Sequence, residues 1–280
     1  MPHTMRERAV VFGSHGGLVG VVTHPNAEGV GARRAVIVAN VGLHHHAGPF
    51  RLYVELARAL AHSGWHTLRF DLSGLGDSQA RPGQLDDAAQ AVLDVTEAMN
   101  WLETHLQISR FVLIGLCSGT DSAHAVTLAD QRVAGAVFID GYTYRTLGYH
   151  VRRHTVRYLQ GKRWMRYAAR RVHTFASQES PSPVPDVFVR EYPSRSRFRD
   201  DVARMTGRGT RLLFVYTGSF DCYYNGRRQL FETLGRAIPA SSESRIDVQM
   251  LPGADHVFTS AAQRAQLLGR IAKWLGTIDA

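Results

Sequence analysis

The sequence predicts an α/β fold, a mostly parallel eight-stranded sheet flanked by helices, and one helical, basic insert. Short apolar runs rich in β-branched residues alternate with segments of helical periodicity, which is typical of strands joined by crossover helices. This alternation stops between Tyr142 and Arg211. We therefore assign residues 1–142 and 212–280 to one core and residues 143–211 to an Arg-rich insert that caps it.

Each predicted strand is a short apolar run that ends in a turn or loop. The runs lie at residues 9–12, 18–24, 35–40, 66–71, 111–116, 133–140, 212–217 and 246–251. Apolar residues recur at helical spacing in residues 49–63, 85–106 and 261–275, which predicts three helices. The first half of the insert also reads as helical, and residues 177–185, rich in Ser and Pro, read as a loop.

The net charge of +9 is concentrated in the insert. Residues 151–211 hold 15 Lys and Arg against 5 Asp and Glu, and the rest of the chain holds 18 against 19. Such a surface would concentrate an anionic substrate or carrier, such as an acyl carrier protein, a coenzyme A thioester or an acidic saccharide. The alternative is a solvated helical face. We expect no nucleic-acid partner, because the chain lacks a nucleic-acid module.

The chain also lacks the signals of export. We find no signal peptide and no uncharged apolar run of about 18 residues, and its two cysteines cannot build a disulfide framework. These observations predict a cytoplasmic protein without a membrane span. We expect no cofactor, and the sequence does not predict an oligomeric state.

One motif carries the chemistry. Gly115-Leu116-Cys117-Ser118-Gly119 follows the apolar run FVLIGL and precedes a helical pattern, which is the strand–turn–helix context of a nucleophile elbow with cysteine in place of serine. The flanking glycines are expected because a Cβ there would collide with the neighbouring strand or helix. The N-terminus of the following helix favours the thiolate of Cys117, and inert packing would not require the two glycines.

A thiolate needs an imidazole, and in this context nucleophile, acid and histidine follow one another along the chain. His256 follows the last predicted strand and should shuttle the proton. Asp221, in the loop after residues 212–217, is the preferred acid. Asp140, at the end of the run 133–140, is the alternative, because it could reach the same imidazole.

The oxyanion hole should combine the N–H of Ser118 with an N–H from the loop NVGLHHHAGPF, where Leu43 is the first candidate and His44 the next. His44, Tyr142 and Phe220 are candidates to line the substrate site. We expect no metal at His44, His45 and His46, because consecutive side chains point in different directions and metal ligands are usually spaced.

The segments VGLHHHAGPFRLYVELARALAHSGWHTLRFDLSGLGDS, LIGLCSG and DQRVAGAVFIDGY resemble bacterial α/β hydrolases associated with exosortase A systems. The resemblance covers residues 35–145. It implies the α/β-hydrolase fold and a Cys117 nucleophile, and a scaffold role for the residues that order the loop below the site: Arg69, Asp71, Gly76, Asp77 and Ser78. Ser118-Gly119 stands where those proteins carry an acidic residue.

Three functions fit this reading. The first is an enzyme that hydrolyses a small-molecule ester or thioester through an acyl-cysteine. The second is an acyltransferase or thioesterase that passes an acyl group from a carrier thioester to an amine or alcohol, since an acyl-cysteine stays reactive toward both. The third is a non-catalytic binding protein on the same fold.

Overall fold

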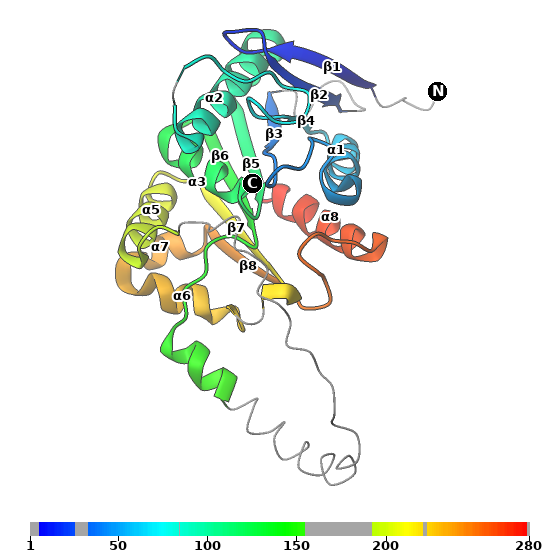
Figure 1. Ribbon diagram of the computed structural model, residues 1–280. Helices are drawn as coiled ribbons and strands as arrows, with labels where there is room; N and C mark the ends of the chain where they lie inside the picture. Colours follow the sequence, from blue (N-terminus) through cyan, green and yellow to red (C-terminus); the bar gives the residue numbers. More distant parts are fainter. Residues whose placement is uncertain (1–5, 26–32, 84, 155–191, 221–222, 279–280) are drawn as a thin grey trace, which may run out of the picture.

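The computed structural model describes residues 6–25, 33–83, 85–154, 192–220 and 223–278. They form an α/β fold with one eight-stranded sheet, as the sequence predicts (Figure 1). The strands are β1 (Arg6–Phe12), β2 (Leu18–His24), β3 (Arg34–Val38), β4 (His66–Phe70), β5 (Arg110–Leu116), β6 (Val133–Ile139), β7 (Arg211–Thr217) and β8 (Ile246–Leu251).

The strand order is β1-β2-β4-β3-β5-β6-β7-β8. The pairs β1–β2 and β2–β4 are antiparallel, and every later pair is parallel. Residues that follow β5, β6, β7 and β8 therefore meet at one edge of the sheet, where ligands of open α/β sheets bind.

Helices cover both faces of the sheet. They are α1 (Leu52–His62), α2 (Asp87–Leu106), α3 (Gly119–Ala129), α5 (Arg195–Gly207), α6 (Arg228–Leu234), α7 (Ala240–Glu243) and α8 (Ala261–Leu275), with short 3₁₀ turns η1 (Pro49–Arg51), η2 (Gly218–Phe220) and η3 (Gly235–Ala237). In Figure 1, α1 and α8 lie on one side and α2, α3 and α5 on the other. Each side has its own buried apolar cluster.

The predicted helix boundaries shift where local bonds decide them. The second helix begins at Asp87 because the carboxylate of Asp86 accepts the N–H of Ala89 at 2.7 Å, which makes Asp86 the N-cap. The first is interrupted after Pro49, because Phe50 and Arg51 have left-handed φ angles of 49° and 63°. Regular helix therefore starts only at Leu52.

One helix inside the segment predicted as insert packs on the sheet. Phe198, Val202 and Met205 of α5 are fully buried in the same cluster as α2 and α3. The start of the insert, residues 147–154, is also helical, and Arg152 Nη1 lies 2.7 Å from Glu232 of α6. The remainder of the insert lies outside the described residues.

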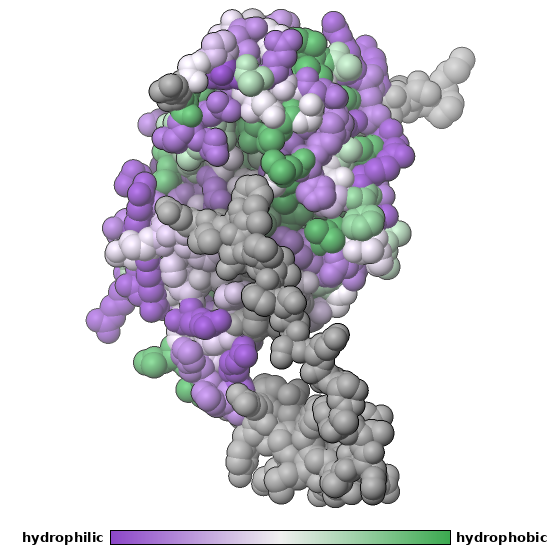
Figure 2. Space-filling model, in the orientation of Figure 1, coloured by the Kyte–Doolittle hydropathy of each residue, from purple (hydrophilic) through white to green (hydrophobic). Residues whose placement is uncertain are grey.

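The surface of the described residues is mostly hydrophilic. Hydrophilic residues predominate on the visible face in Figure 2, and hydrophobic residues form scattered patches between them. Among the described residues, no helix combines the length and apolar character that crossing a membrane requires.

Candidate active site

Cys117 occupies a sharp turn between β5 and α3. Its φ of 52° lies in the left-handed region, which is strained for a residue with a side chain. The Cys117 backbone N–H donates to Ile139 O at 2.9 Å, and the residue is partly exposed. The turn therefore holds the sulfur up from the sheet edge, within reach of a ligand.

The two flanking glycines are required by close backbone contacts. A Cβ on Gly115 would lie 2.3 Å from Gly119 O, and one on Gly119 would lie 2.6 Å from Asn40 O. Both distances are far below van der Waals contact, and both obstacles are backbone atoms. The packing of the turn is thus as tight as the sequence motif predicts.

His256 follows β8, and its side chain is hydrogen bonded to Cys117. The hydrogen bond with Asp140 and then that with Cys117 raise the pKa of His256 to about 9, although burial acts to lower it. The imidazole therefore holds its proton at neutral pH, as a base paired with both a thiol and a carboxylate should.

Asp140 is the carboxylate that orients this imidazole. His256 Nδ1 lies 2.8 Å from Asp140 Oδ2, and the Asp140 side chain is completely buried. Thr217 at the end of β7 donates its N–H to Oδ1 at 2.8 Å and its hydroxyl to Oδ2 at 2.6 Å. Both oxygens of the buried carboxyl group are therefore hydrogen bonded, as buried polar groups require.

The preferred acid of the sequence analysis, Asp221, lies outside the described residues. Of the two candidates, the structure connects Asp140 to the histidine. It also adds two residues that the sequence did not indicate. Thr217 fixes the Asp140 carboxylate, and the Ser219 hydroxyl accepts the backbone N–H of His256 at 3.0 Å. No motif marks either one, since both are common residues in a strand end and a loop.

The loop after β3 lies beside the turn that holds Cys117. Gly42 N–H donates to the Ser118 hydroxyl at 2.7 Å, and His44 N–H donates to Val41 O at 3.0 Å. The Leu43 side chain, between them, is 72% exposed. The two predicted oxyanion-hole residues, Leu43 and Ser118, thus belong to segments that a hydrogen bond joins.

A cavity of about 390 Å³ opens next to these segments. Ser118, Gly42 and Leu43 lie on its wall. The other lining residues come from the end of β3, the loop after β4 and the first turns of α2 and α3: Asn40, Leu72, Ser73, Leu75, Asp87, Ala88, Gln90, Ala91, Asp121 and Ser122.

The cavity wall does not include the candidate lining residues His44 and Tyr142. The His44 side chain is exposed. The Tyr142 ring is buried and packs edge-on against His124 and Phe198. The Phe220 side chain lies outside the described part of the structure.

Two of the three consecutive histidines do come together, contrary to the geometric expectation. The rings of His45 and His46 lie 3.7 Å apart, and with Asp71 and Asp77 they form a group whose ligand atoms lie within 4.8 Å of one another and could hold a metal ion. The irregular backbone of this loop lets neighbouring side chains point the same way, which regular structure would prevent.

Hydrogen bonds account for these contacts. His46 Nδ1 lies 2.7 Å from Asp71 Oδ2, and His45 Nε2 lies 3.0 Å from Asp77 Oδ2. Ala47 N–H donates to His45 Nδ1 at 3.2 Å, so Nδ1 is the acceptor and Nε2 carries the ring proton. That proton faces the Asp77 carboxylate, and Nε2 then has no lone pair to give to a metal ion. The group ties the loop to the turn after β4.

Four of the five scaffold residues named by the resemblance share this role, and Arg69 does not. Asp71 is completely buried, and its Oδ1 accepts Asn40 Nδ2 at 2.9 Å. Ser78 Oγ donates to Asp71 O at 2.5 Å. A Cβ on Gly76 would lie 2.3 Å from Asp71 Oδ2. Arg69 points elsewhere, with its guanidinium 3.8 Å from Glu7 of β1.

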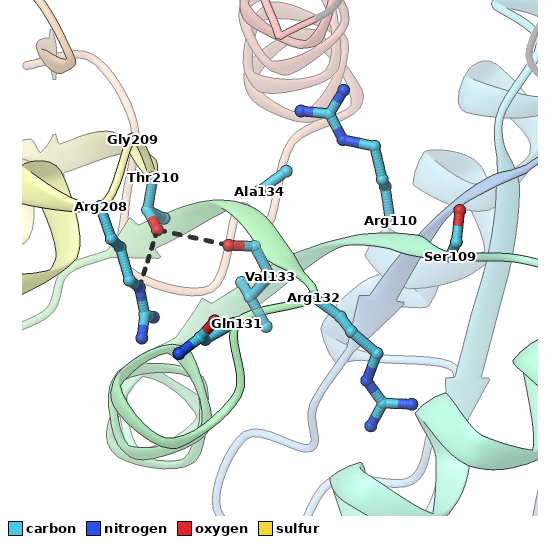
Figure 3. Close-up of a pocket in the computed structure, with 9 residues that line it drawn as sticks. All are labelled: Ser109, Arg110, Gln131, Arg132, Val133, Ala134, Arg208, Gly209 and Thr210. Carbon is cyan, nitrogen blue, oxygen red and sulfur yellow. Dashed lines mark hydrogen bonds between the residues drawn. The ribbon is translucent and has the colours of Figure 1, made fainter.

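A second cavity, of about 230 Å³, lies at the opposite, amino-terminal ends of β5, β6 and β7. Arg110, Arg132 and Arg208 line it, but Figure 3 shows their side chains pointing away from one another. Arg132 is already bound to Asp130 and Glu103. The cavity therefore lacks convergent charges and is far from the cysteine.

The strand order, the turn around Cys117 and the histidine after the last strand together define a class of fold. The sequence model of the α/β hydrolase fold family matches residues 40–208, more than half of the chain. The protein therefore belongs to the α/β-hydrolase fold family.

Solved structures agree over almost the whole chain. The esterase Pf2001 of Pyrococcus furiosus is 16% identical, with 98% of this chain and 93% of that one covered and a TM-score of 0.60. A serine hydrolase homologue from Coxiella burnetii is 17% identical, with coverages of 96% and 97% and a TM-score of 0.57. A hypothetical protein from Pseudomonas aeruginosa is 18% identical, with coverages of 100% and 95% and a TM-score of 0.59. At these identities the likeness is one of fold. A search of curated proteins found no match.

Proposed function

We propose that the protein is an acyl-processing enzyme in which Cys117, His256 and Asp140 form a catalytic triad. One observation carries the proposal: a strained cysteine at the sheet edge is hydrogen bonded to a histidine whose other nitrogen meets a buried carboxylate at 2.8 Å. Inert packing of a cysteine would require neither partner. Similarity to structures named esterase and serine hydrolase supports the same reaction class.

The reaction begins with attack of the Cys117 thiolate on the carbonyl carbon of an ester or thioester, which forms a C–S bond and an oxyanion. The N–H groups of Ser118 and Leu43 stabilise that oxyanion. As it collapses, the bond to the alcohol or thiol breaks and protonated His256 gives its proton to the leaving group. Asp140 stabilises the imidazolium between these steps.

The acyl-cysteine is then released. Neutral His256 takes a proton from water as the water oxygen attacks the acyl carbon, and collapse of this second intermediate returns the thiolate and frees a carboxylic acid. An amine or alcohol in place of water would give acyl transfer by the same steps. Hydrolysis is the reaction that the family fold favours, and transfer is the alternative that a cysteine nucleophile makes accessible.

The cavity beside Ser118 suits a small acyl or leaving group. Its volume of about 390 Å³ falls at the lower end of the range of about 300–1,000 Å³ for small-molecule sites. The basic insert supports an anionic carrier, such as a coenzyme A thioester or an acyl carrier protein, as the other part of the substrate.

The decisive experiment is intact-mass spectrometry after incubation with a panel of acyl thioesters and esters. We expect an acyl adduct on the wild-type protein, mapped to Cys117 by peptide analysis, and none at that position in Cys117→Ala. Cys117→Ser should retain at most weak turnover, because a hydroxyl needs stronger base assistance. Unchanged turnover by Cys117→Ala would refute the proposal.

The same panel separates the remaining alternatives. Added amines or alcohols that divert the acyl group from the free acid would indicate transfer, and unaltered acid formation would indicate hydrolysis. Coenzyme A thioesters that react faster than neutral short-chain thioesters, with the advantage lost at high salt, would support the anionic carrier. A ligand that binds without any adduct or product would instead indicate a non-catalytic binding protein.

A further inference from the structure

The Ser118 side chain makes a contact that the proposed reaction does not use. Its Oγ accepts the Gly42 N–H at 2.7 Å, and the two residues are 76 positions apart in the sequence. Gly42 has a left-handed φ of 51°, so the loop bends sharply where the bond forms. The bond links the nucleophile turn directly to the oxyanion loop.

Other contacts hold the base of this loop. Asn40 Nδ2 donates to His44 O at 2.7 Å, and the Asn40 carbonyl lies so close to Gly119 that a Cβ there would be 2.6 Å away. The tip is different, since Gly42 and Leu43 are both exposed. The Ser118 bond therefore acts on the part of the loop that packing controls least.

Consecutive amides of the loop have different roles as a result. The Gly42 N–H is occupied by Ser118 Oγ. The next amide, that of Leu43, donates to no group among the described residues. Ser118 itself contributes its own N–H from the start of α3, where the dipole of the helix adds positive potential.

We infer that Ser118 is a positioning residue: its hydroxyl holds Gly42 so that the Leu43 N–H points to the oxyanion beside the Ser118 N–H. This inference rests on the proposed function of Cys117. Ser118 would thus determine both donors of the oxyanion hole. Its backbone supplies the first N–H, and its side chain orients the second, that of Leu43. Preorganised donors act without having to reorient during the reaction, which is the source of their effect.

Ser118→Ala tests the inference because it removes the hydroxyl and keeps the backbone N–H. We expect the rate constant for acylation of Cys117 to fall by about 3- to 10-fold, the loss of one ordinary hydrogen bond, with little change in the half-saturating substrate concentration. Ser118→Thr keeps a hydroxyl and should restore most of the rate. Ser109→Ala, an exposed serine at the other end of β5, is the matched control.

Two readouts are needed. The first is the burst of p-nitrophenol from p-nitrophenyl acetate, with acyl-Cys117 measured by mass. The second is hydrogen exchange of the Gly42 amide in protein labelled with ¹⁵N-glycine, which does not depend on activity. Gly42 exchange should be slow in wild type and in Ser118→Thr, and fast in Ser118→Ala.

The outcomes are distinguishable. Slower acylation together with faster Gly42 exchange in Ser118→Ala, reversed in Ser118→Thr, supports the positioning role. Wild-type acylation rates in Ser118→Ala overturn it, whatever the exchange shows, and so does unchanged Gly42 exchange. If the wild-type protein itself forms no acyl-Cys117 with any ester or thioester, the proposed function fails and the positioning role fails with it.

Discussion

Replacing Asp140 by Asn gives the sharpest test of how the site is built. The pKa of His256 is raised from its ordinary 6.5 to about 9, which corresponds to about 3 kcal/mol in favour of the imidazolium. The bond to Asp140 is the largest contribution and that to Cys117 the second. A hydrogen bond to a charged group is typically worth about 2 kcal/mol, which is roughly a 30-fold factor.

This factor should appear in the reactivity of the sulfur. Without the carboxylate the imidazolium is destabilised, so the pair shifts from thiolate and imidazolium toward neutral thiol and imidazole. We therefore expect alkylation of Cys117 by iodoacetamide at pH 6.5 to slow by roughly 30-fold in Asp140→Asn. Alkylation is followed by intact mass across pH 6.5 to 9, and circular dichroism melting confirms that the variant is folded.

Two control variants complete the design. Asp200→Asn changes an exposed carboxylate on α5 and should alkylate at the wild-type rate. Asp221→Asn should do the same. Equal alkylation rates in Asp140→Asn and wild type would refute the reasoning, and a slowing found only in Asp221→Asn would transfer the role of the acid to that residue.

Further predictions concern the turn and the pH dependence of stability. Gly119→Ala should lower the free energy of unfolding by about 1–3 kcal/mol, because the new Cβ would meet the Asn40 carbonyl oxygen at 2.6 Å. Gly269→Ala is the control, since a Cβ there has open space around it, and it should not destabilise the protein. Denaturant titration measures both, and equal effects of the two substitutions would contradict the packing argument. The pKa of His256 in the folded protein is raised to about 9. The hydrogen bonds of protonated His256 to Asp140 and Cys117 therefore stabilise the protein fully below about pH 6.5, and this stabilisation is lost as the pH rises through 9. The stability difference between wild type and His256→Gln should shrink across that window, and a difference that grows with pH would contradict the sign of the shift.

The sequence predicted the sheet and the sharp strand–helix turn at Cys117 because both depend on local patterns. Each strand is a separate apolar run, and the turn needs glycines at fixed positions beside Cys117, which a chain records directly. The sequence also placed His256 directly after the last strand, and its role as the base stays a prediction. These features depend on neighbours in sequence, so they can be read without coordinates.

The choice of acid could not be read in this way. Asp140 and Asp221 both follow apolar runs, and their order along the chain does not say which carboxylate reaches the imidazole. Asp140 has a φ of 47°, which turns its side chain out of the strand direction toward β7 and His256. Aspartate adopts this left-handed conformation only occasionally, so the local sequence does not signal it.

Composition concealed the helix α5. Phe198, Val202 and Met205 recur at helical spacing, but Arg195, Arg197 and other charged residues surround them. The segment therefore reads as part of a basic insert, although its apolar stripe is buried on the sheet. The periodicity of a few apolar positions was the informative signal, and average charge was misleading.

The position of β8 at the edge of the sheet affects how the site unfolds on heating. Among the described residues this strand pairs only with β7, and His256 lies in the loop that follows it. A strand bonded on one side separates at a lower free-energy cost than the central ones. Gentle heating should therefore separate His256 from Cys117 while the rest of the sheet stays intact, and a firmer connection of β8 to the sheet would keep the two side chains together at higher temperature.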